Sequence, residues 1–310
     1  MKKIFKIVLI NIILIIFFVC SIEFIALYTF YREKVFNIYN DNFQYNTEFK
    51  YYFKHLFNKY KNKNYVLYDE FRPAIGTEYD KSAILLLGCS YTYGSILPEE
   101  ETFQYKLSQK TKRPVYNFGV EGASAKEMLY ILRNDELRNK LLNNNNNIEY
   151  VIFTYITDHI PRLYAPVYRR PSPTFIPSKD FSELKLKDKK SLFYRCYIYF
   201  FISRHFAFKE ENYHNSFNLI HLYFKEIKRE TEKHFKSNSK KPQFVVLIYD
   251  DYSKFPWAQL EEDGIKVIFA EKITQTNLKE SKYRIPNDYH PSSKAWDIIV
   301  PALVKELNIK

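Results

Sequence analysis

The sequence predicts an α/β fold in which a five-stranded parallel sheet lies between two layers of helices. Two observations support this prediction. From residue 81 onward, short apolar runs alternate with longer amphipathic segments, which is typical of strand–helix–strand units. The short runs are apolar at consecutive positions, as expected of strands that are buried on both faces. The expected strands cover residues 83–87, 114–118, 148–156, 244–249 and 265–269.

Four longer helices are expected between and after these strands. The segment 124–142 has the clearest start signal, because Ser124 precedes it and Glu127 follows three residues later. This spacing is a capping box. Five consecutive asparagines at 143–147 form the loop that follows. The other helices are expected at 100–110, 217–235 and 292–307.

The N-terminal segment predicts a membrane anchor. Residues 1–6 carry three lysines, and an apolar run over 7–30 follows them. This run is long enough, at about 1.5 Å per residue, to cross a hydrocarbon core of about 30 Å. We expect an uncleaved signal anchor, and a cleaved signal peptide is the alternative. Both place the later residues outside the cytoplasm, in the periplasm or at the cell surface, because the lysines precede the apolar run.

The rest of the chain divides into a stalk and a domain. Residues 31–80 are polar, aromatic and basic, and we interpret them as a juxtamembrane stalk. The expected catalytic domain covers 81–310. Within it, the segment 160–208 contains five prolines in its first eighteen residues. That segment is long for a loop in a compact domain, so we interpret it as an insertion or a lid.

Composition excludes some classes of function. The net charge of +12 would suit a nucleic-acid partner, but the lysines are scattered and no nucleic-acid-binding motif occurs. We attribute the charge to a Lys-, Ile- and Asn-rich composition and expect no nucleic-acid partner. A basic surface would still suit an acidic polysaccharide or an anionic lipid. The three cysteines, Cys20, Cys89 and Cys196, form no CxxC pair, so we expect no structural zinc, and no cofactor.

A serine follows the first expected strand directly. Ser90 lies in the segment GCSYTYG at 88–94. Ligands of parallel α/β sheets bind beyond the carboxyl ends of the strands, so the Ser90 hydroxyl is a candidate nucleophile that needs an adjacent base. A tight turn with Ser90 as a helix N-cap is the alternative.

A glycine follows the second expected strand, in the segment NFGVEG at 117–122. Gly119 could present its backbone N–H to a developing oxyanion, and a plain turn glycine is the alternative. Four of the six glycines in the chain lie in these two strand ends, which favours the first interpretation.

The last expected helix is preceded by the segment NDYHP at 287–291. His290 is a candidate general base, since an imidazole exchanges protons near neutral pH. Asp288 could hold its tautomer as in other catalytic triads. A surface-loop histidine is the alternative.

Together these segments resemble the SGNH-hydrolase (GDSL-like) superfamily. GCSYTYG resembles the first block of the family, usually written GDSxTxG; NFG resembles the second, and DYHP the last. The segment ETF at 101–103 also resembles one found in extracytoplasmic members. The resemblance covers roughly residues 81–310 and implies a flavodoxin-like fold. It also implies Ser90 as nucleophile, His290 as base with Asp288 as its partner, and an oxyanion hole that contains the N–H groups of Ser90 and Gly119.

Two departures concern the first and last blocks. Cys89 stands where the family usually has Asp, and we expect it to be a packing residue rather than a nucleophile. The last block usually reads DxxH, whereas Asn287 occupies the third position before His290. We therefore assign the orienting role to Asp288.

The third block of the family supplies an asparagine to the oxyanion hole, and this chain has none there. The third expected strand ends in the segment TYITDHIPR at 154–162. Thr157 lies nearest to the expected place and could donate through its hydroxyl, and His159 or Arg162 could stabilise the oxyanion instead. A structural ion pair between Asp158 and Arg162 is the alternative.

The expected function is that of an extracytoplasmic serine esterase that acts on O-acyl esters, most simply O-acetyl esters, of an envelope glycan or a lipid-linked saccharide. This substrate class follows from the expected location and the resemblance alone. An O-acyltransferase using the same site and a catalytically weakened glycan-binding protein are the alternatives.

Overall fold

The computed structural model describes residues 71–163, 173, 175–178, 182–186, 210–237, 240–250 and 255–309, together with Phe18 and Ser21. The described residues from 71 onward belong to one compact unit. Apart from those two residues, the anchor predicted over 7–30 lies outside the described part, as do much of the predicted stalk and most of the predicted insertion. Among the described residues, no helix has the length and apolarity that crossing a bilayer requires.

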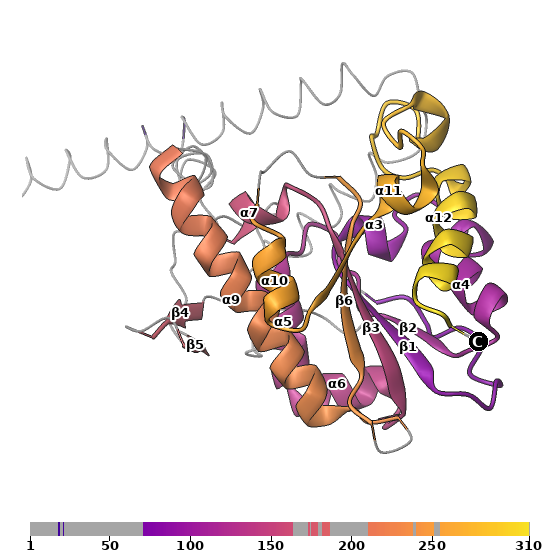
Figure 1. Cartoon of the computed structure of the whole chain (residues 1–310), viewed down its shortest axis with the longest axis horizontal. Coiled ribbons are helices and arrows are strands. Elements are labelled where there is room, and N and C mark those ends of the chain that lie inside the picture. The colour runs from indigo at the N-terminus through magenta and orange to yellow at the C-terminus, as the bar shows by residue number, and fades with distance from the viewer. Residues whose placement is uncertain are drawn as a thin grey trace, which may run out of the picture. The chain divides into compact units, whose positions relative to one another are not determined.

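A five-stranded sheet in which all neighbouring strands are parallel forms the middle layer (Figure 1). Its order is β2-β1-β3-β6-β7, so the chain builds outward from β1 to β2 and then continues on the other side of β1. The predicted strands are confirmed, with ends that agree within one residue. Their bounds are Ala83–Leu87 (β1), Val115–Asn117 (β2), Ile148–Tyr155 (β3), Gln243–Ile248 (β6) and Lys266–Phe269 (β7).

Helices cover both faces of the sheet, which confirms the predicted three layers. Figure 1 shows α4 (Phe103–Thr111) and α12 (Ser293–Glu306) on one face, and α5 (Ala125–Arg133) and α9 (Glu210–His234) on the other. Because successive strand residues point to opposite faces, the sheet separates two apolar cores. Ile84 and Leu86 pack in the core that contains Trp296, whereas Leu85 and Leu87 pack in the core that contains Met128.

The helix predicted over 124–142 is two helices, α5 and α6 (Asp135–Leu142). They meet at Asn134, which has an extended backbone and accepts the Leu137 N–H at 3.0 Å through its side chain. Asparagine is a weak helix former and a strong N-cap, so the chain starts a new helix there. The predicted capping box at the start of α5 is confirmed, since the Glu127 carboxylate accepts from the N–H and the hydroxyl of Ser124 at 2.8 Å each.

Two of the other predicted helices start at positions that differ from the prediction. A 3₁₀ turn, η2 (Glu99–Glu101), precedes α4, which is capped by Thr102. The helix α9 starts seven residues before the predicted position. Several short elements were not predicted, because they are too short to show a period: α3 (Ser90–Tyr93), α7 (His159–Arg162), β4 (Phe175–Pro177), β5 (Leu184–Leu186), α10 (Ala258–Glu262), α11 (Ala270–Thr274) and η4 (Ser281–Tyr283).

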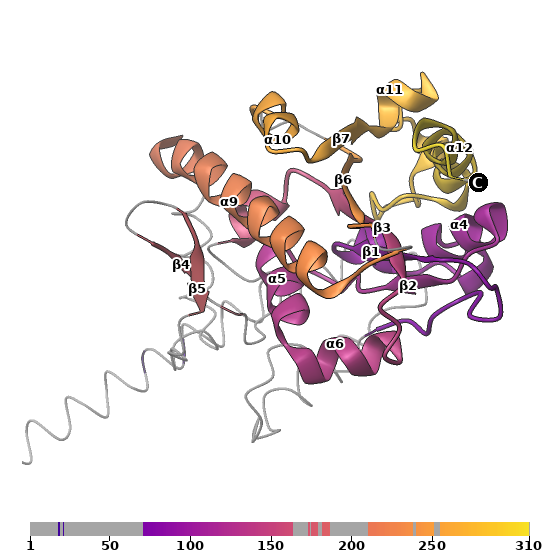
Figure 2. The ribbon, with the colours of Figure 1, turned by 60° about the horizontal axis from the view of Figure 1, so that its bottom comes forward.

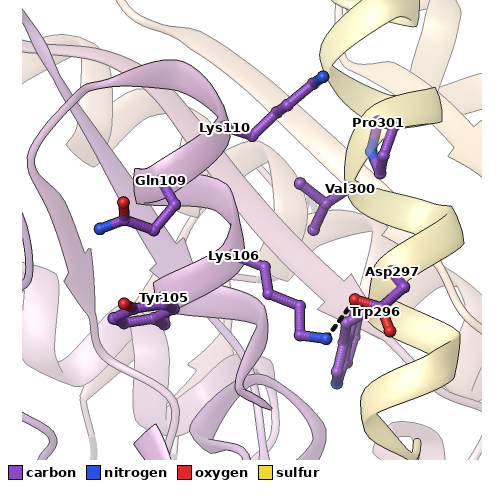
Figure 3. Close-up of a pocket in the computed structure, with 8 residues that line it drawn as sticks. All are labelled: Tyr105, Lys106, Gln109, Lys110, Trp296, Asp297, Val300 and Pro301. Carbon is purple, nitrogen blue, oxygen red and sulfur yellow. Dashed lines mark hydrogen bonds and ion pairs between the residues drawn. The ribbon is translucent and has the colours of Figure 1, made fainter. Parts of the chain in front are cut away.

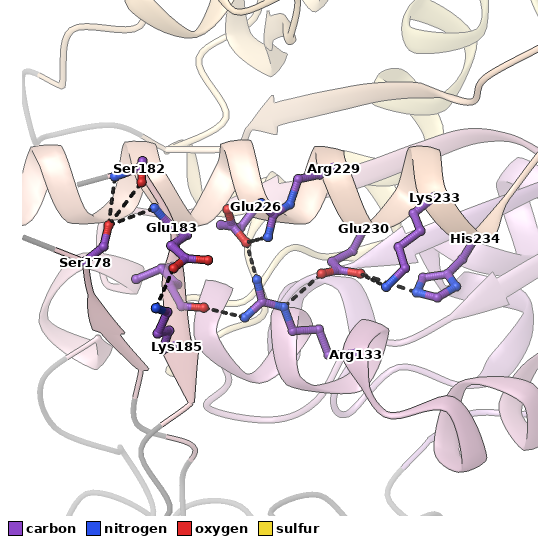
Figure 4. Close-up of polar contacts among 11 residues, drawn as sticks. Arg133, Ser178, Ser182, Glu183, Lys185, Glu226, Arg229, Glu230, Lys233 and His234 are labelled. Carbon is purple, nitrogen blue, oxygen red and sulfur yellow. Dashed lines mark hydrogen bonds and ion pairs between the residues drawn. The ribbon is translucent and has the colours of Figure 1, made fainter. Parts of the chain in front are cut away.

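The strands β4 and β5 form an antiparallel hairpin next to α9 (Figure 2). Arg133, at the end of α5, links the hairpin to that helix (Figure 4). Its guanidinium donates to the Leu184 carbonyl at 2.6 Å and to Glu230 Oε1 at 2.9 Å, and it also contacts Glu226. Burial raises the pKa of Glu226. Arg133 therefore fixes α5, α9 and the hairpin to one another.

Candidate active site

The candidate nucleophile lies in a tight turn between β1 and α3. Ser90 is the first residue of α3, and Cys89 occupies the N-cap position. The alternative that Ser90 is the helix N-cap is therefore wrong. Gly88, with φ of 150°, makes the turn. A Cβ there would lie 2.2 Å from Thr92 Oγ1, so only glycine allows α3 to fold back this closely. Ser90 is largely buried, and Cys89 is fully buried in the apolar core.

The imidazole of His290 reaches this serine from the other end of the chain. His290 Nε2 lies 2.8 Å from Ser90 Oγ, which is hydrogen-bond distance. On the other side of the ring, His290 Nδ1 contacts Asp288 Oδ1. The side chains of His290 and Asp288 are each 24% exposed, so solvent reaches the site. The structure thus brings together the three residues that the sequence predicted as a triad.

This arrangement fixes what each ring nitrogen can do. A carboxylate can only accept a hydrogen bond, so Nδ1 carries the proton that faces Asp288. Nε2 of the neutral ring then has a lone pair directed at the Ser90 hydroxyl and can accept its proton. This is the tautomer that a general base for a serine nucleophile requires.

Gly119 lies close to α3, but its N–H already has a partner. It donates to Asn117 Oδ1 at 2.8 Å, and Asn117 Nδ2 donates to the Thr92 carbonyl at 2.8 Å. A Cβ on Gly119 would meet Tyr93 N at 2.5 Å. Glycine is therefore required at this position for close packing. Its predicted oxyanion role remains a prediction, and it would require the Asn117 side chain to move.

Thr157 follows β3, the strand next to β1, and an acidic residue holds its backbone. Its N–H donates to Asp250 Oδ1 at 3.1 Å, and Asp250 lies two residues past β6. Burial raises the pKa of Asp250. Asp250 was not predicted as a site residue. A usable signal existed, because an acidic residue that follows a buried parallel strand lies at the same sheet edge as Ser90.

The other auxiliary candidates have structural roles here. Arg162 donates to Asp158 Oδ2 at 3.2 Å and to the Ala123 carbonyl at 3.2 Å, so the alternative of an ion pair is the one observed. His159 is fully buried, with its ring 5.3 Å from that of Phe153 and 5.7 Å from that of Tyr155. Those two rings lie in the core on the α5–α9 face, whereas Tyr91, next to Ser90, lies in the other core. The suggestion that His159 stabilises an oxyanion therefore fails.

The buried His159 predicts a specific pH dependence of stability. Among the residues that the structure describes, neither ring nitrogen of His159 has a hydrogen-bond partner. Desolvation, helped by the charge of Arg162, lowers the pKa of His159 well below its ordinary value of 6.5. Below about pH 6.5 the unfolded chain binds a proton that the folded chain does not. The free energy of unfolding therefore falls as pH falls through this window, by at most about 1.4 kcal/mol per pH unit.

The substitution His159→Phe keeps an aromatic ring and removes the titration. We expect the variant to lose less unfolding free energy than the wild type between pH 7 and pH 5, as measured by urea denaturation at several pH values. Other titrating groups contribute equally to both proteins, so the difference isolates His159. The expectation would be contradicted if the free energy of unfolding fell equally with pH in the wild type and in His159→Phe.

A groove of about 350 Å³ lies between α4 and α12 (Figure 3). It does not include the triad. Lys106 crosses it and donates to the hydroxyl of Ser293 at 2.7 Å and to its carbonyl at 3.1 Å, and it also contacts Asp297. These contacts fix the first turn of the helix that follows His290. The groove is lined by Tyr105, Lys106, Gln109, Lys110, Trp296, Asp297, Val300 and Pro301.

Comparison with known proteins gives structural likenesses only. No family model matches the chain, and no curated protein matches it. A member of the lipolytic G-D-S-L family from Veillonella parvula matches 73% of this chain and 98% of its own, with 11% identity and a TM-score of 0.41. The psychrotrophic esterase EstA from Pseudoalteromonas matches 74% of this chain and 97% of its own, with 12% identity and a TM-score of 0.42.

An acetyl xylan esterase from Butyrivibrio proteoclasticus matches 74% of this chain and 64% of its own, with 9% identity and a TM-score of 0.44. In all three comparisons the TM-score lies below 0.5 and the identity is far below 25%. These likenesses therefore do not assign a function to the chain.

Proposed function

We propose that this chain is a serine esterase of the SGNH type that cleaves O-acyl esters through an acyl-enzyme on Ser90. One observation carries the proposal: His290 Nε2 lies 2.8 Å from Ser90 Oγ while Nδ1 of the same ring contacts Asp288. A serine hydroxyl is a weak nucleophile until an adjacent base takes its proton. The sequence segments that resemble the SGNH blocks carry these same three residues.

In the first half of the reaction, Ser90 Oγ attacks the ester carbonyl carbon while His290 Nε2 takes the hydroxyl proton. The tetrahedral intermediate collapses as the imidazolium gives that proton to the leaving alkoxide, so an alcohol departs and Ser90 is acylated. In the second half, His290 takes a proton from water while the water oxygen attacks the acyl carbon. The second tetrahedral intermediate collapses as the imidazolium gives that proton to Ser90 Oγ, so the carboxylic acid departs and the serine is regenerated. Asp288 holds the ring orientation and stabilises the imidazolium in both halves.

Preorganised hydrogen-bond donors stabilise the oxyanion. The Ser90 N–H is one candidate, because the first N–H groups of a helix have no acceptor within that helix. The hydroxyl of Thr157 is the second, in the place where the family has an asparagine, and the Gly119 N–H is a third if Asn117 releases it. Loss of one such donor lowers kcat by roughly 10²–10³-fold in a serine protease, so this set of donors decides how fast the enzyme is.

For the substrate, we propose an O-acetyl or similar short acyl group on an envelope glycan or a lipid-linked saccharide. The support is the N-terminal sequence, in which three lysines precede an apolar run and so favour an extracytoplasmic domain. The partly exposed side chains of His290 and Asp288 suit a site that a polymeric substrate can reach.

The direct test is acetate release by the purified full chain. We expect hydrolysis of a short-chain aryl acetate and, with higher kcat/KM, release of acetate from an O-acetylated polysaccharide. A saccharide acceptor added to the same reaction separates water from sugar as the acyl acceptor, because acetylated acceptor in the products indicates a transferase. A folded protein that releases acetate from neither substrate would contradict the proposal.

A further inference from the structure

The loop that carries Asp288 and His290 has an unfavourable backbone. Asn287 and Tyr289 have φ values of 62° and 66°, in the left-handed region. Asparagine adopts this region readily, but a bulky residue such as Tyr289 is disfavoured there, and its conformation persists only where the surroundings impose it. The loop closes on itself through two backbone hydrogen bonds, from Ile285 N to the His290 carbonyl at 2.8 Å and from Asp288 N to the Ile285 carbonyl at 3.2 Å.

The side chain of Tyr289 does not hold this loop, since the residue is 73% exposed. The backbone carbonyl of Tyr289 is the group that anchors the loop. The Tyr91 hydroxyl donates to this oxygen at 3.1 Å, and Arg284 Nη1 donates to it at 3.2 Å. The peptide between Tyr289 and His290 is therefore fixed by two side chains, and its orientation determines where the imidazole of His290 points.

Tyr91 is well suited to this task because it is itself fixed. It follows Ser90 in the chain and is largely buried. Its ring meets that of Tyr249 edge to face, with centroids 5.2 Å apart, and lies 5.0 Å from the ring of His290. Burial raises the pKa of Tyr91 far above 10, so the phenol keeps its proton and remains a donor throughout the working pH range of an esterase.

We propose that Tyr91 is a positioning residue: its hydroxyl holds the Tyr289 carbonyl and thereby aims His290 Nε2 at Ser90 Oγ. This inference rests on the proposed esterase function. Tyr91, which follows the nucleophile Ser90, holds Tyr289, which precedes the base His290. Tyr91 and Tyr289 are 198 positions apart in the chain. This hydrogen bond therefore links the segment that carries the nucleophile to the segment that carries the base.

Tyr91→Phe tests the inference, because it removes the hydroxyl and keeps the ring. We expect kcat for a short-chain aryl ester to fall on the order of tenfold, as for a lost hydrogen bond that misplaces a catalytic group. KM should stay within about twofold, since Tyr91 acts through His290 and not through the substrate. The rate of Ser90 labelling by a fluorophosphonate should fall by the same factor as kcat.

Tyr249→Phe is the matched control. Tyr249 is also a buried tyrosine that packs on Tyr91, but its hydroxyl has no hydrogen-bond partner in the part of the chain that the structure describes. We expect its kcat and KM to equal those of the wild type. An active wild type together with equal kcat values for the two variants would overturn the inference and leave the esterase function intact. An inactive wild type would instead remove the proposed function itself.

Folding of each variant is checked by near-UV circular dichroism. If Tyr91→Phe does not fold, Arg284→Gln takes its place, because it removes the second donor to the same carbonyl at a more exposed position. We expect a smaller loss of kcat for Arg284→Gln, again at unchanged KM. Wild-type kcat in a folded Arg284→Gln protein would then overturn the inference.

Discussion

Ser90→Ala is expected to lower kcat for a short-chain aryl ester by at least about 10³-fold, because without the hydroxyl no acyl-enzyme forms. The residual rate would come from the oxyanion donors and substrate binding alone. His290→Ala should have an effect of the same size. The double variant should be no slower than either single variant, since the two residues act as one unit.

Cys89→Ala is the control for Ser90→Ala. Cys89 precedes the nucleophile and is a free, fully buried cysteine, so a thiol nucleophile is the nearest rival to the serine. We expect Cys89→Ala to keep most of the activity, with a modest loss of stability from the missing sulfur atom. Activity that survives Ser90→Ala and disappears in Cys89→Ala would reverse the assignment. The measurement is steady-state kinetics on folded proteins.

Asp288→Asn is expected to lower kcat by roughly 10³–10⁴-fold with little change in KM. The amide keeps the size of the carboxylate, but its NH₂ group can donate to Nδ1. The amide would then favour the His290 tautomer that carries its proton on Nε2, and a protonated Nε2 cannot accept the proton of Ser90. It also removes the charge that stabilises the imidazolium in the transition state. The measurement is kcat and KM across pH 6 to 9.

Asp297→Asn is the matched control for this change. Asp297 is also a carboxylate close to the start of α12, but it is 59% exposed and pairs with Lys106. Exposed pairs contribute little to stability, so kcat and the melting temperature should stay near the wild-type values. An Asp288→Asn enzyme as active as Asp297→Asn would show that Asp288 does not orient His290.

The strands and the position of Ser90 were predictable from sequence because both follow from local rules. Consecutive apolar residues mark a strand that is buried on both faces, and the carboxyl ends of parallel strands meet at one edge. Ser90 follows β1 directly, so its position was fixed once the strand was identified. The His290 segment could be placed there only through its resemblance to a family block, because nothing local to that loop specifies where it folds.

The features that were not predicted depend on contacts distant in sequence or on competing local preferences. The break at Asn134 arises because N-capping of a new helix outweighs continuation of the old one. The hydrogen bond from Tyr91 to Tyr289 joins residues 198 positions apart, and no periodicity indicates it. His159 has the chemistry of a site residue, and only the three-dimensional structure shows that aromatic rings enclose it.

The central claim is that His290 activates Ser90 for covalent attack. Its most direct test is to react the purified chain with a fluorophosphonate and map the modified residue by peptide mass spectrometry. We predict a single adduct on Ser90 that forms rapidly in the wild type and very slowly in His290→Ala. An adduct on another residue, or equal labelling rates in the wild type and His290→Ala, would contradict the claim.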